Sequence, residues 1–249
     1  GRSVGLAQRE LQALPTGGRT PLAAGLEEAR RMLERQRRRV RDSLPLLVLI
    51  TDGRANFSRG GDPVEEALRA ARVGVAGAGG LGSNAVLMLA RSGVEHFLLI
   101  DDDVVDASNL NRQQFWPRHL GRPKVEVLAE LVRELNPDAR VETCRLRIDA
   151  ANVDGLVARC PLWLEALDGA ADKRLLVERA MLSGRRIASA SGMGGFGGKP
   201  MQKRVLGNLV LVGDFETDIL EYPPLAPRVT EAAALLADAM LEFILTGVE

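Results

Sequence analysis

Residues 72–100 read RVGVAGAGGLGSNAVLMLARSGVEHFLLI, and this stretch indicates how the rest of the chain folds. Residues 73–76 are typical of a short buried strand, which a cluster of glycines follows: Gly77, Gly79, Gly80 and Gly82. Periodic apolar residues at 85–90 predict a helix, and residues 96–100 predict a second strand that ends at Asp101. Such a glycine turn lets backbone N–H groups approach phosphate oxygens, and an acid after the second strand can accept ribose hydroxyls. We therefore expect a nucleotide site.

The kind of nucleotide is indicated by the residues that follow. A glycine turn with a downstream acid is by itself typical of NAD or FAD binding, so an oxidoreductase stays open as an alternative. The next loop contains SNLNRQ at 108–113, and Lys124 follows the residues GRP at 121–123. Because an arginine and a lysine that converge on one turn suit a triphosphate, Arg112 and Lys124 favour ATP.

Four segments together resemble the ThiF/MoeB/HesA family, which is related to ubiquitin-activating enzymes. They are GAGGLGSN (77–84), IDDDVVDASNLNRQ (100–113), GRPK (121–124) and LEALDGAADK (164–173). The resemblance is strongest to the ThiF-like group and covers Arg72 to the C-terminus. It implies an ATP- and Mg²⁺-dependent adenylyltransferase, which activates the C-terminal glycine of a small ubiquitin-like sulfur carrier (ThiS-like, ending in Gly-Gly) and releases pyrophosphate. Thiamine biosynthesis is the implied pathway.

The resemblance also implies roles for single residues. Asp101 would bind the ribose with Asp103 in support, and Asp168 would hold the Mg²⁺. Arg112 and Lys124 would be the fixed cations that lower the reaction barrier where charge builds up on the phosphates. The expected nucleotide-binding residues are Gly77, Gly79, Gly80, Asp101, Asp103, Ser108, Asn109, Arg112 and Lys124. The expected catalytic residues are Arg112, Lys124 and Asp168.

From Arg72 onward, strand and helix patterns alternate, which predicts a doubly wound, Rossmann-like α/β domain with a mostly parallel sheet. Further strands are expected at 140–148, 162–167 and 186–190, and further helices at 124–135, 152–159, 171–182 and 225–245. Residues 203–213 predict an antiparallel hairpin. The glycine-rich loop before it, Ser189–Pro200, is the expected channel for the carrier's extended tail.

Residues 1–71 have a different character. LPTGGRTPLAAGL (14–26) and LLVLITDGRAN (46–56) resemble the C-terminal half of the von Willebrand factor A domain in magnesium- and cobalt-chelatase subunits. In that family Thr20 and Asp52 belong to a metal site, but its Asp-x-Ser-x-Ser element is missing here, so we expect no working metal cage. The arginine-rich helix expected at 23–41 is interpreted as a solvated surface. The chain is thus expected to be a chimera of a partial segment, 1–71, and a ThiF-like domain, 72–249.

Composition excludes several classes of protein. Lys plus Arg and Asp plus Glu number 33 each, so no net charge attracts the chain to nucleic acid or to a membrane. With no long apolar run and no signal-peptide pattern, we expect a cytoplasmic protein. Neither Cys144 nor Cys160 belongs to a C-x-x-C pair, and both are interpreted as packing residues. His96 and His119 have no partner at catalytic spacing and are treated as structural.

Two further alternatives stay open. A dehydratase of the tRNA threonylcarbamoyladenosine type would share these motifs, although a neutral chain does not favour RNA. A non-enzymatic, chelatase-associated interaction module would rest on the N-terminal half. Members of the family are commonly homodimers in which a partner's arginine reaches the phosphates. A homodimer is therefore expected, but no residue here matches that arginine.

Overall fold

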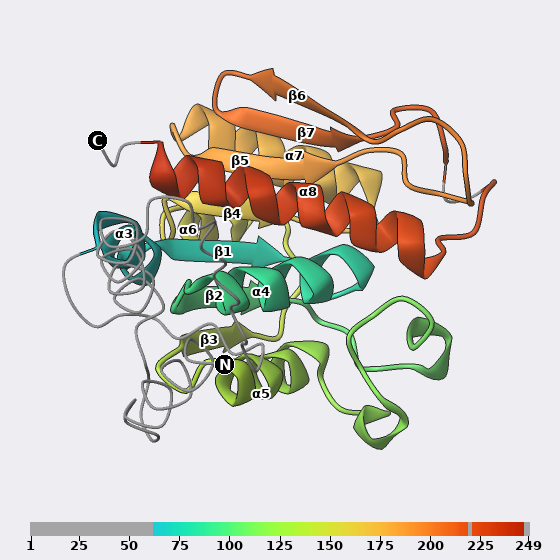
Figure 1. The fold of residues 1–249 in the computed structure, drawn as a ribbon, viewed down its shortest axis with the longest axis horizontal. Helices are drawn as coiled ribbons and strands as arrows, with labels where there is room; N and C mark the ends of the chain where they lie inside the picture. The colour runs from blue at the N-terminus through green and yellow to red at the C-terminus, as the bar shows by residue number, and fades with distance from the viewer. Residues whose placement is uncertain (1–61, 219–220, 247–249) are drawn as a thin grey trace, which may run out of the picture. The chain divides into compact units, whose positions relative to one another are not determined.

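The computed structural model describes residues 62–218 and 221–246. The predictions for residues 1–61, including those for Thr20, Asp52 and the helix at 23–41, lie outside the described residues. Seven strands form one sheet in the order β3-β2-β1-β4-β5-β7-β6 (Figure 1). The strands are β1 (Arg72–Ala76), β2 (His96–Ile100), β3 (Arg140–Cys144), β4 (Leu162–Glu165), β5 (Arg186–Ala190), β6 (Gln202–Leu206) and β7 (Leu209–Gly213).

The strand directions confirm the predicted fold class. All neighbouring strands are parallel except β6, which pairs with β7 as an antiparallel hairpin. The α-helices are α3 (Pro63–Ala70), α4 (Gly80–Ser92), α5 (Lys124–Leu135), α6 (Val153–Val157), α7 (Ala170–Leu182) and α8 (Ala226–Leu245), with two 3₁₀ turns, η1 (Ala107–Asn109) and η2 (Pro117–His119). The result is a Rossmann-like sheet with helices on both faces.

Two apolar clusters cover the two faces of the sheet. On one face, side chains such as Val73 and Val75 pack with helices α4, α5 and α8. On the other face, Trp163 packs with α6 and α7. A Cβ on Gly74 would lie 2.8 Å from the Trp163 ring, so the strand needs glycine there to make room for the indole. Because successive side chains of a strand point to opposite faces of the sheet, the same strands contribute to both apolar clusters.

Helix α8 lies along α4, and alanines such as Ala232 and Ala233 let the two helices approach closely (Figure 1). Helix α3 falls within the expected segment 1–71, yet it packs against α8 in a compact unit that begins at Pro63. Within residues 62–218 and 221–246 we find no helix with the length and apolarity that a bilayer crossing needs.

Some element boundaries differ from the predicted ones. β4 ends at Glu165 rather than at 167, because the Glu165 carboxylate accepts the N–H of Leu167 at 2.6 Å and turns the chain. β3 ends at Cys144 rather than at 148, and the chain after it folds where the Asn152 amide donates to the carbonyl of Arg147. α4 begins at Gly80, five residues before the predicted start, so Gly80 and Gly82 belong to the first turn of the helix.

Candidate nucleotide site

The candidate site lies where the strand order reverses. β1 has β2 on one side and β4 on the other, and the crevice beyond the carboxyl ends of such strands is where open α/β sheets bind ligands. Gly77 follows β1, Asp101 follows β2, and Asp168 follows β4 by three residues. Three predicted site residues therefore lie along one edge of the sheet.

The glycines of the turn have different tasks. Gly77 has a φ of 96°, and a Cβ there would lie 2.3 Å from the carbonyl oxygen of Ala166. A Cβ on Gly82 would lie 1.8 Å from the carbonyl oxygen of Gly77. Both glycines are therefore required by the fold itself, as is expected where a turn, a helix and a strand meet closely.

Gly79 is different, because the space around it is open. The nearest atom to a Cβ there would be Nε2 of Gln113, at 3.6 Å. Gly79 is also the N-cap of α4, and no side chain caps the helix. The first-turn N–H groups and the positive end of the helix dipole are thus available to an anion, which fits a phosphate.

Asp101 joins the second strand to the glycine turn. Its Oδ2 accepts the N–H of Ala78 at 2.6 Å, and its Oδ1 accepts the N–H of Asp103 at 2.8 Å. Burial raises the pKa of Asp101 above its ordinary value, while these two N–H groups and the Lys124 ammonium act in the opposite direction. Each carboxylate oxygen keeps a second lone pair, so this geometry still allows the acid to accept ribose hydroxyls.

Lys124 is the first residue of α5, and its ammonium is buried. Nζ lies 2.6 Å from Oδ2 of Asp103, with the lysine side chain 5% exposed and the aspartate side chain 62% exposed. The lysine backbone N–H also donates to the carbonyl of Asp103 at 3.0 Å. The ammonium is therefore held beside Asp103 in the loop after β2, as expected if Lys124 and this loop bind one nucleotide.

Arg112 lies across the glycine turn. Its Cγ is 3.4 Å from the position of a Cβ on Gly80, and its guanidinium donates to Asn111 Oδ1 and to the carbonyl of Ser108. The Asn84 amide on α4 donates to the carbonyl of Arg112 at 3.0 Å, which ties this loop to the helix. The arginine thus has a fixed backbone beside the helix N-terminus.

Ser108 and Asn109 shape the same loop. The Ser108 hydroxyl donates to Oδ1 of Asp106 at 2.7 Å, and Oδ1 of Asn109 accepts the N–H of Asp106 at 3.3 Å. Oδ1 of Asp106 also accepts the backbone N–H of Ser108 at 2.8 Å, and the side chains of Asp106 and Asn109 form a capping box around η1. Direct bonds from Ser108 and Asn109 to a nucleotide stay a prediction.

Three groups were missed by sequence reasoning. Gln113 is 8% exposed, and its Nε2 is the nearest atom to a Cβ on Gly79, while its Oε1 has no hydrogen-bond partner among the described residues. Ser83 accepts the N–H of Gln114 at 3.1 Å and fixes the loop from the helix side. Glu165 is fully buried at the end of β4. A charged residue inside the apolar run LWLEAL was the available signal for Glu165.

The metal prediction concerns Asp168, an exposed residue just before α7. Mg²⁺ usually takes one or two carboxylates together with substrate phosphates and waters, so one aspartate at this edge fits an ion carried by a nucleotide. Among the described residues, the carboxylates of Asp101, Asp102 and Asp103 also lie within 4.8 Å of one another. Asp101 and Asp103 in that group already bind Ala78 and Lys124, respectively.

The two cysteines and His119 make packing or structural contacts. Cys160 is fully buried, and burial raises the pKa of its thiol. Cys144 is half-buried at the end of β3, where Arg159 contacts its sulfur at 3.3 Å. His119 is buried against Trp116 and accepts that residue's N–H, as expected for a structural histidine.

The chain is similar to several known proteins. The model of the ThiF family matches residues 52–208. The adenylyltransferase and sulfurtransferase UBA4 of Yarrowia lipolytica is 40% identical over 126 residues, which cover 51% of this chain and 32% of that protein. The SAMP-activating enzyme E1 of Haloferax volcanii is 44% identical over 110 residues, covering 44% and 41%. The chain thus spans less than half the length of these curated relatives.

Solved structures share the fold. The E. coli tRNA N6-threonylcarbamoyladenosine dehydratase TcdA, in complex with AMP, has a TM-score of 0.69 at 22% identity and covers 75% of this chain and 90% of that one. E. coli MccB with ATP has a TM-score of 0.61 at 22% identity and covers 73% and 58%. Both likenesses concern the arrangement of the sheet and its helices.

Proposed function

Because this chain belongs to the ThiF family, we propose that it adenylates the C-terminal carboxylate of a small ubiquitin-like sulfur carrier and releases pyrophosphate from ATP. The names of two relatives support this proposal, since one is an adenylyltransferase and sulfurtransferase and the other a SAMP-activating enzyme. We further propose a ThiS-like carrier that ends in Gly-Gly, a role in thiamine sulfur transfer and a homodimeric enzyme.

The observation that carries the proposal is the pair of cations around one glycine turn. Arg112 lies against Gly80 at the start of α4, and Lys124 is tethered to Asp103, two residues from the expected ribose acid. Two fixed cations suit a polyphosphate whose charge must be matched during reaction. This arrangement favours ATP over NAD.

The proposed reaction needs little proton chemistry. An oxygen of the ionised glycine carboxylate attacks the α-phosphorus, and the bond from that phosphorus to the bridging oxygen breaks, which releases pyrophosphate. Asp101 would orient the ribose, while Arg112 and Lys124 would stabilise charge on the phosphate oxygens. Asp168 would hold Mg²⁺, which neutralises phosphate charge when bound.

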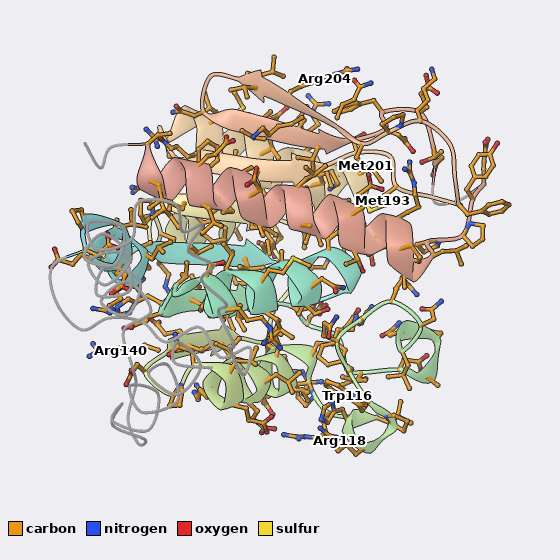
Figure 2. All side chains as sticks on the ribbon, viewed as in Figure 1. Trp116, Arg118, Arg140, Met193, Met201 and Arg204 are labelled. Atoms are coloured by element: carbon orange, nitrogen blue, oxygen red, sulfur yellow. The ribbon has the colours of Figure 1, made fainter. Side chains whose placement is uncertain are left out.

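The glycine-rich loop supports a channel for the carrier tail. It follows β5 at the same edge of the sheet, and Gly195, Gly197 and Gly198 have positive φ angles. Met193 and Met201 anchor its two ends against the core cluster that includes α8 (Figure 2). A backbone without side chains at several positions lets an extended glycine tail lie close to it.

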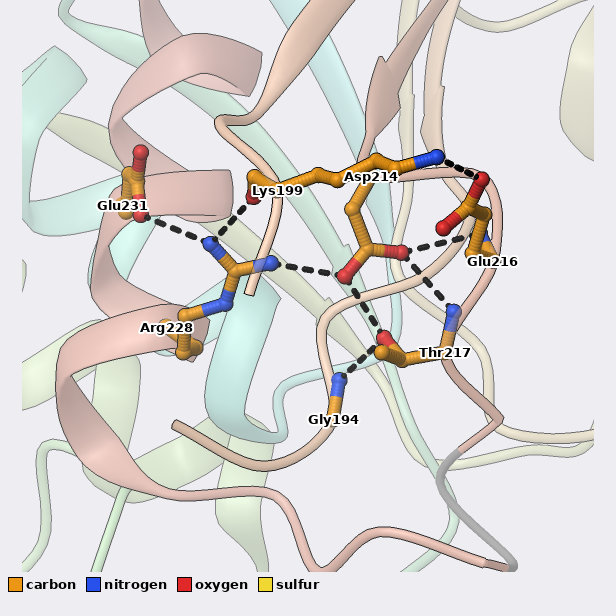
Figure 3. A network of polar contacts seen from close by, with 7 residues as sticks. All are labelled: Gly194, Lys199, Asp214, Glu216, Thr217, Arg228 and Glu231. Atoms are coloured by element: carbon orange, nitrogen blue, oxygen red, sulfur yellow. Dashed lines mark hydrogen bonds and ion pairs between the residues drawn. The ribbon is translucent and has the colours of Figure 1, made fainter. Parts of the chain in front are cut away.

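A buried ion pair holds this loop in shape. Arg228 on α8 donates to Oδ2 of Asp214 at 2.6 Å and to the carbonyl of Lys199 at 3.0 Å (Figure 3). The Thr217 hydroxyl accepts the N–H of Gly194 at 2.9 Å and donates to Asp214 at 2.7 Å. The loop is therefore preformed, which lowers the entropic cost of ordering a substrate tail.

Nucleotide choice can be tested by thermal unfolding of the full chain. ATP with Mg²⁺ is expected to raise the midpoint temperature, because a ligand that binds only the folded state stabilises it. NAD at the same concentration is expected to leave it unchanged. Protection by NAD alone would overturn the proposal and support an oxidoreductase.

A further inference from the structure

Glu165 is a buried carboxylate with a complete set of partners. The residue is 0% exposed at the end of β4. Its Oε1 accepts the N–H of Leu167 at 2.6 Å, and its Oε2 accepts the Ser189 hydroxyl at 2.6 Å and forms an ion pair with the Lys173 ammonium. Since an unpaired buried carboxylate is strongly destabilising, these contacts form one interdependent cluster.

The partners of Glu165 lie on both sides of Asp168 in the chain. Leu167 directly precedes Asp168. Lys173 lies in the first turn of α7, where its N–H donates to the carbonyl of Gly169 at 2.9 Å. One carboxylate therefore fixes the backbone before Asp168 and the helix after it, so the path of this short segment is constrained at both ends.

The same cluster reaches the glycine-rich loop. Ser189 lies on β5, and the Lys173 ammonium also donates to the carbonyl of Ala190 at 3.3 Å, at the last residue of that strand. Because Ser189 and Ala190 belong to β5, the loop that was expected from Ser189 begins at the next residue, Ser191. The segment that carries Asp168 and the start of the loop are therefore joined through the ion pair of Glu165 with Lys173.

We propose that Glu165, with Lys173, is a positioning residue that sets the Asp168 carboxylate for a divalent cation and couples it to the glycine-rich loop. The inference rests on the proposed function, since it takes Asp168 as the metal ligand. Because Mg²⁺ takes only one or two protein carboxylates, the orientation of the Asp168 carboxylate strongly affects the metal affinity. Because Lys173 balances the charge of Glu165, the exposed Asp168 is left to attract the cation.

The test uses Mn²⁺ as the probe, with its binding to the ATP complex of the full chain followed by electron paramagnetic resonance. Glu165→Gln keeps the size of the side chain, but its amide nitrogen cannot accept from Ser189 or Lys173. We expect the Mn²⁺ dissociation constant to rise about tenfold or more, as for other groups that orient metal ligands. ATP affinity measured in EDTA should stay within about twofold. Glu178→Gln, which alters an exposed pair with Arg174 on α7, is the matched control and should change neither value.

A second variant guards against a folding defect. Glu165→Gln combined with Lys173→Met removes both charges and leaves no unpaired ammonium, and it should weaken Mn²⁺ binding as the single variant does. Lys173→Arg keeps the ion pair and should retain most of the affinity. Unchanged Mn²⁺ affinity in both Glu165 variants would overturn this inference. So would a loss of ATP affinity in EDTA as large as the loss of Mn²⁺ affinity. Either result would leave the proposed function standing. Absence of ATP binding by the unmodified protein would overturn the proposed function as well.

Discussion

The ammonium of Lys124 lies 2.6 Å from Oδ2 of Asp103, whose backbone N–H in turn donates to the Asp101 carboxylate at 2.8 Å. The expected phosphate cation and the expected ribose acid are therefore joined through one residue. An ammonium has three N–H donors, so a polyphosphate can bind Lys124 while the ion pair with Asp103 persists. The lysine is thus held in place before the ligand arrives, and its reorganisation on binding is small.

Replacing Lys124 by Met is expected to lower the rate of adenylation by about two to three orders of magnitude, the usual effect of losing one donor to developing charge. The measurement is single-turnover formation of the acyl-adenylate at saturating ATP. Arg122→Gln is the matched control, because Arg122 lies two residues away and pairs with Glu130 at the surface. Equal rates for Lys124→Met and the unmodified chain would remove Lys124 from the site.

Asp101→Asn is expected to weaken ATP binding about 10- to 100-fold, since hydrogen bonds to a charged acceptor contribute about 1.5–3 kcal/mol. The same substitution should weaken the binding of 2′,3′-dideoxy-ATP much less, because that nucleotide has no ribose hydroxyls to donate and is affected only through the N–H groups of Ala78 and Asp103. Calorimetric titration with both nucleotides measures the difference. Asp102→Asn, at the exposed neighbouring residue, serves as the control. A similar loss with both nucleotides would contradict the ribose role.

Gly82→Ala is expected to destabilise the fold by about 2–4 kcal/mol, because the added Cβ would lie 1.8 Å from the carbonyl oxygen of Gly77. Elsewhere in a helix the same substitution raises stability by about 0.5–1 kcal/mol, and Gly155→Ala on α6, where the space is open, should do so. Urea unfolding of both variants gives the two free energies of unfolding. A stabilised Gly82→Ala variant would show that the turn geometry is wrong.

The sequence predicted most of the sheet because its strands are apolar runs separated by glycine turns and amphipathic helices. Asp101 was predictable since an acid that ends a parallel strand must lie at the ligand edge. The structural roles of Gly77 and Gly82 were not predictable. They depend on how closely Gly77 approaches Ala166 and Gly82 approaches Gly77 in three dimensions. The same is true of Glu165, whose partners come from a second strand and a helix.

The ion pair between Asp214 and Arg228 shows the same limit, since the two residues are 14 positions apart and neither belongs to a motif. Burial would raise the pKa of Asp214, but the N–H groups of Thr217 and Glu216, the Thr217 hydroxyl and the Arg228 guanidinium together hold that pKa at about 2. An aspartate whose pKa is lower in the folded state than in the unfolded state stabilises the fold at neutral pH and loses this contribution on acidification.

For Asp214 the pKa falls from its ordinary 3.8 to about 2, which corresponds to about 2 kcal/mol of stability. This contribution should be fully present above about pH 5 and disappear as the pH falls from about 4 towards 2. The free energy of unfolding of Asp214→Asn, measured in urea across that range, should lack this pH-dependent part. A parallel pH dependence in both proteins would contradict the buried ion pair.

The central claim is that the chain activates the carboxylate of a carrier protein with ATP. Carrier-dependent exchange of labelled pyrophosphate into ATP tests it most directly, with small host proteins that end in Gly-Gly as substrates and Asp168→Asn as the control. We predict exchange that requires a carrier and falls by at least about two orders of magnitude in Asp168→Asn. Bound ATP without exchange in the presence of every such carrier, or exchange that survives Asp168→Asn undiminished, would contradict the account.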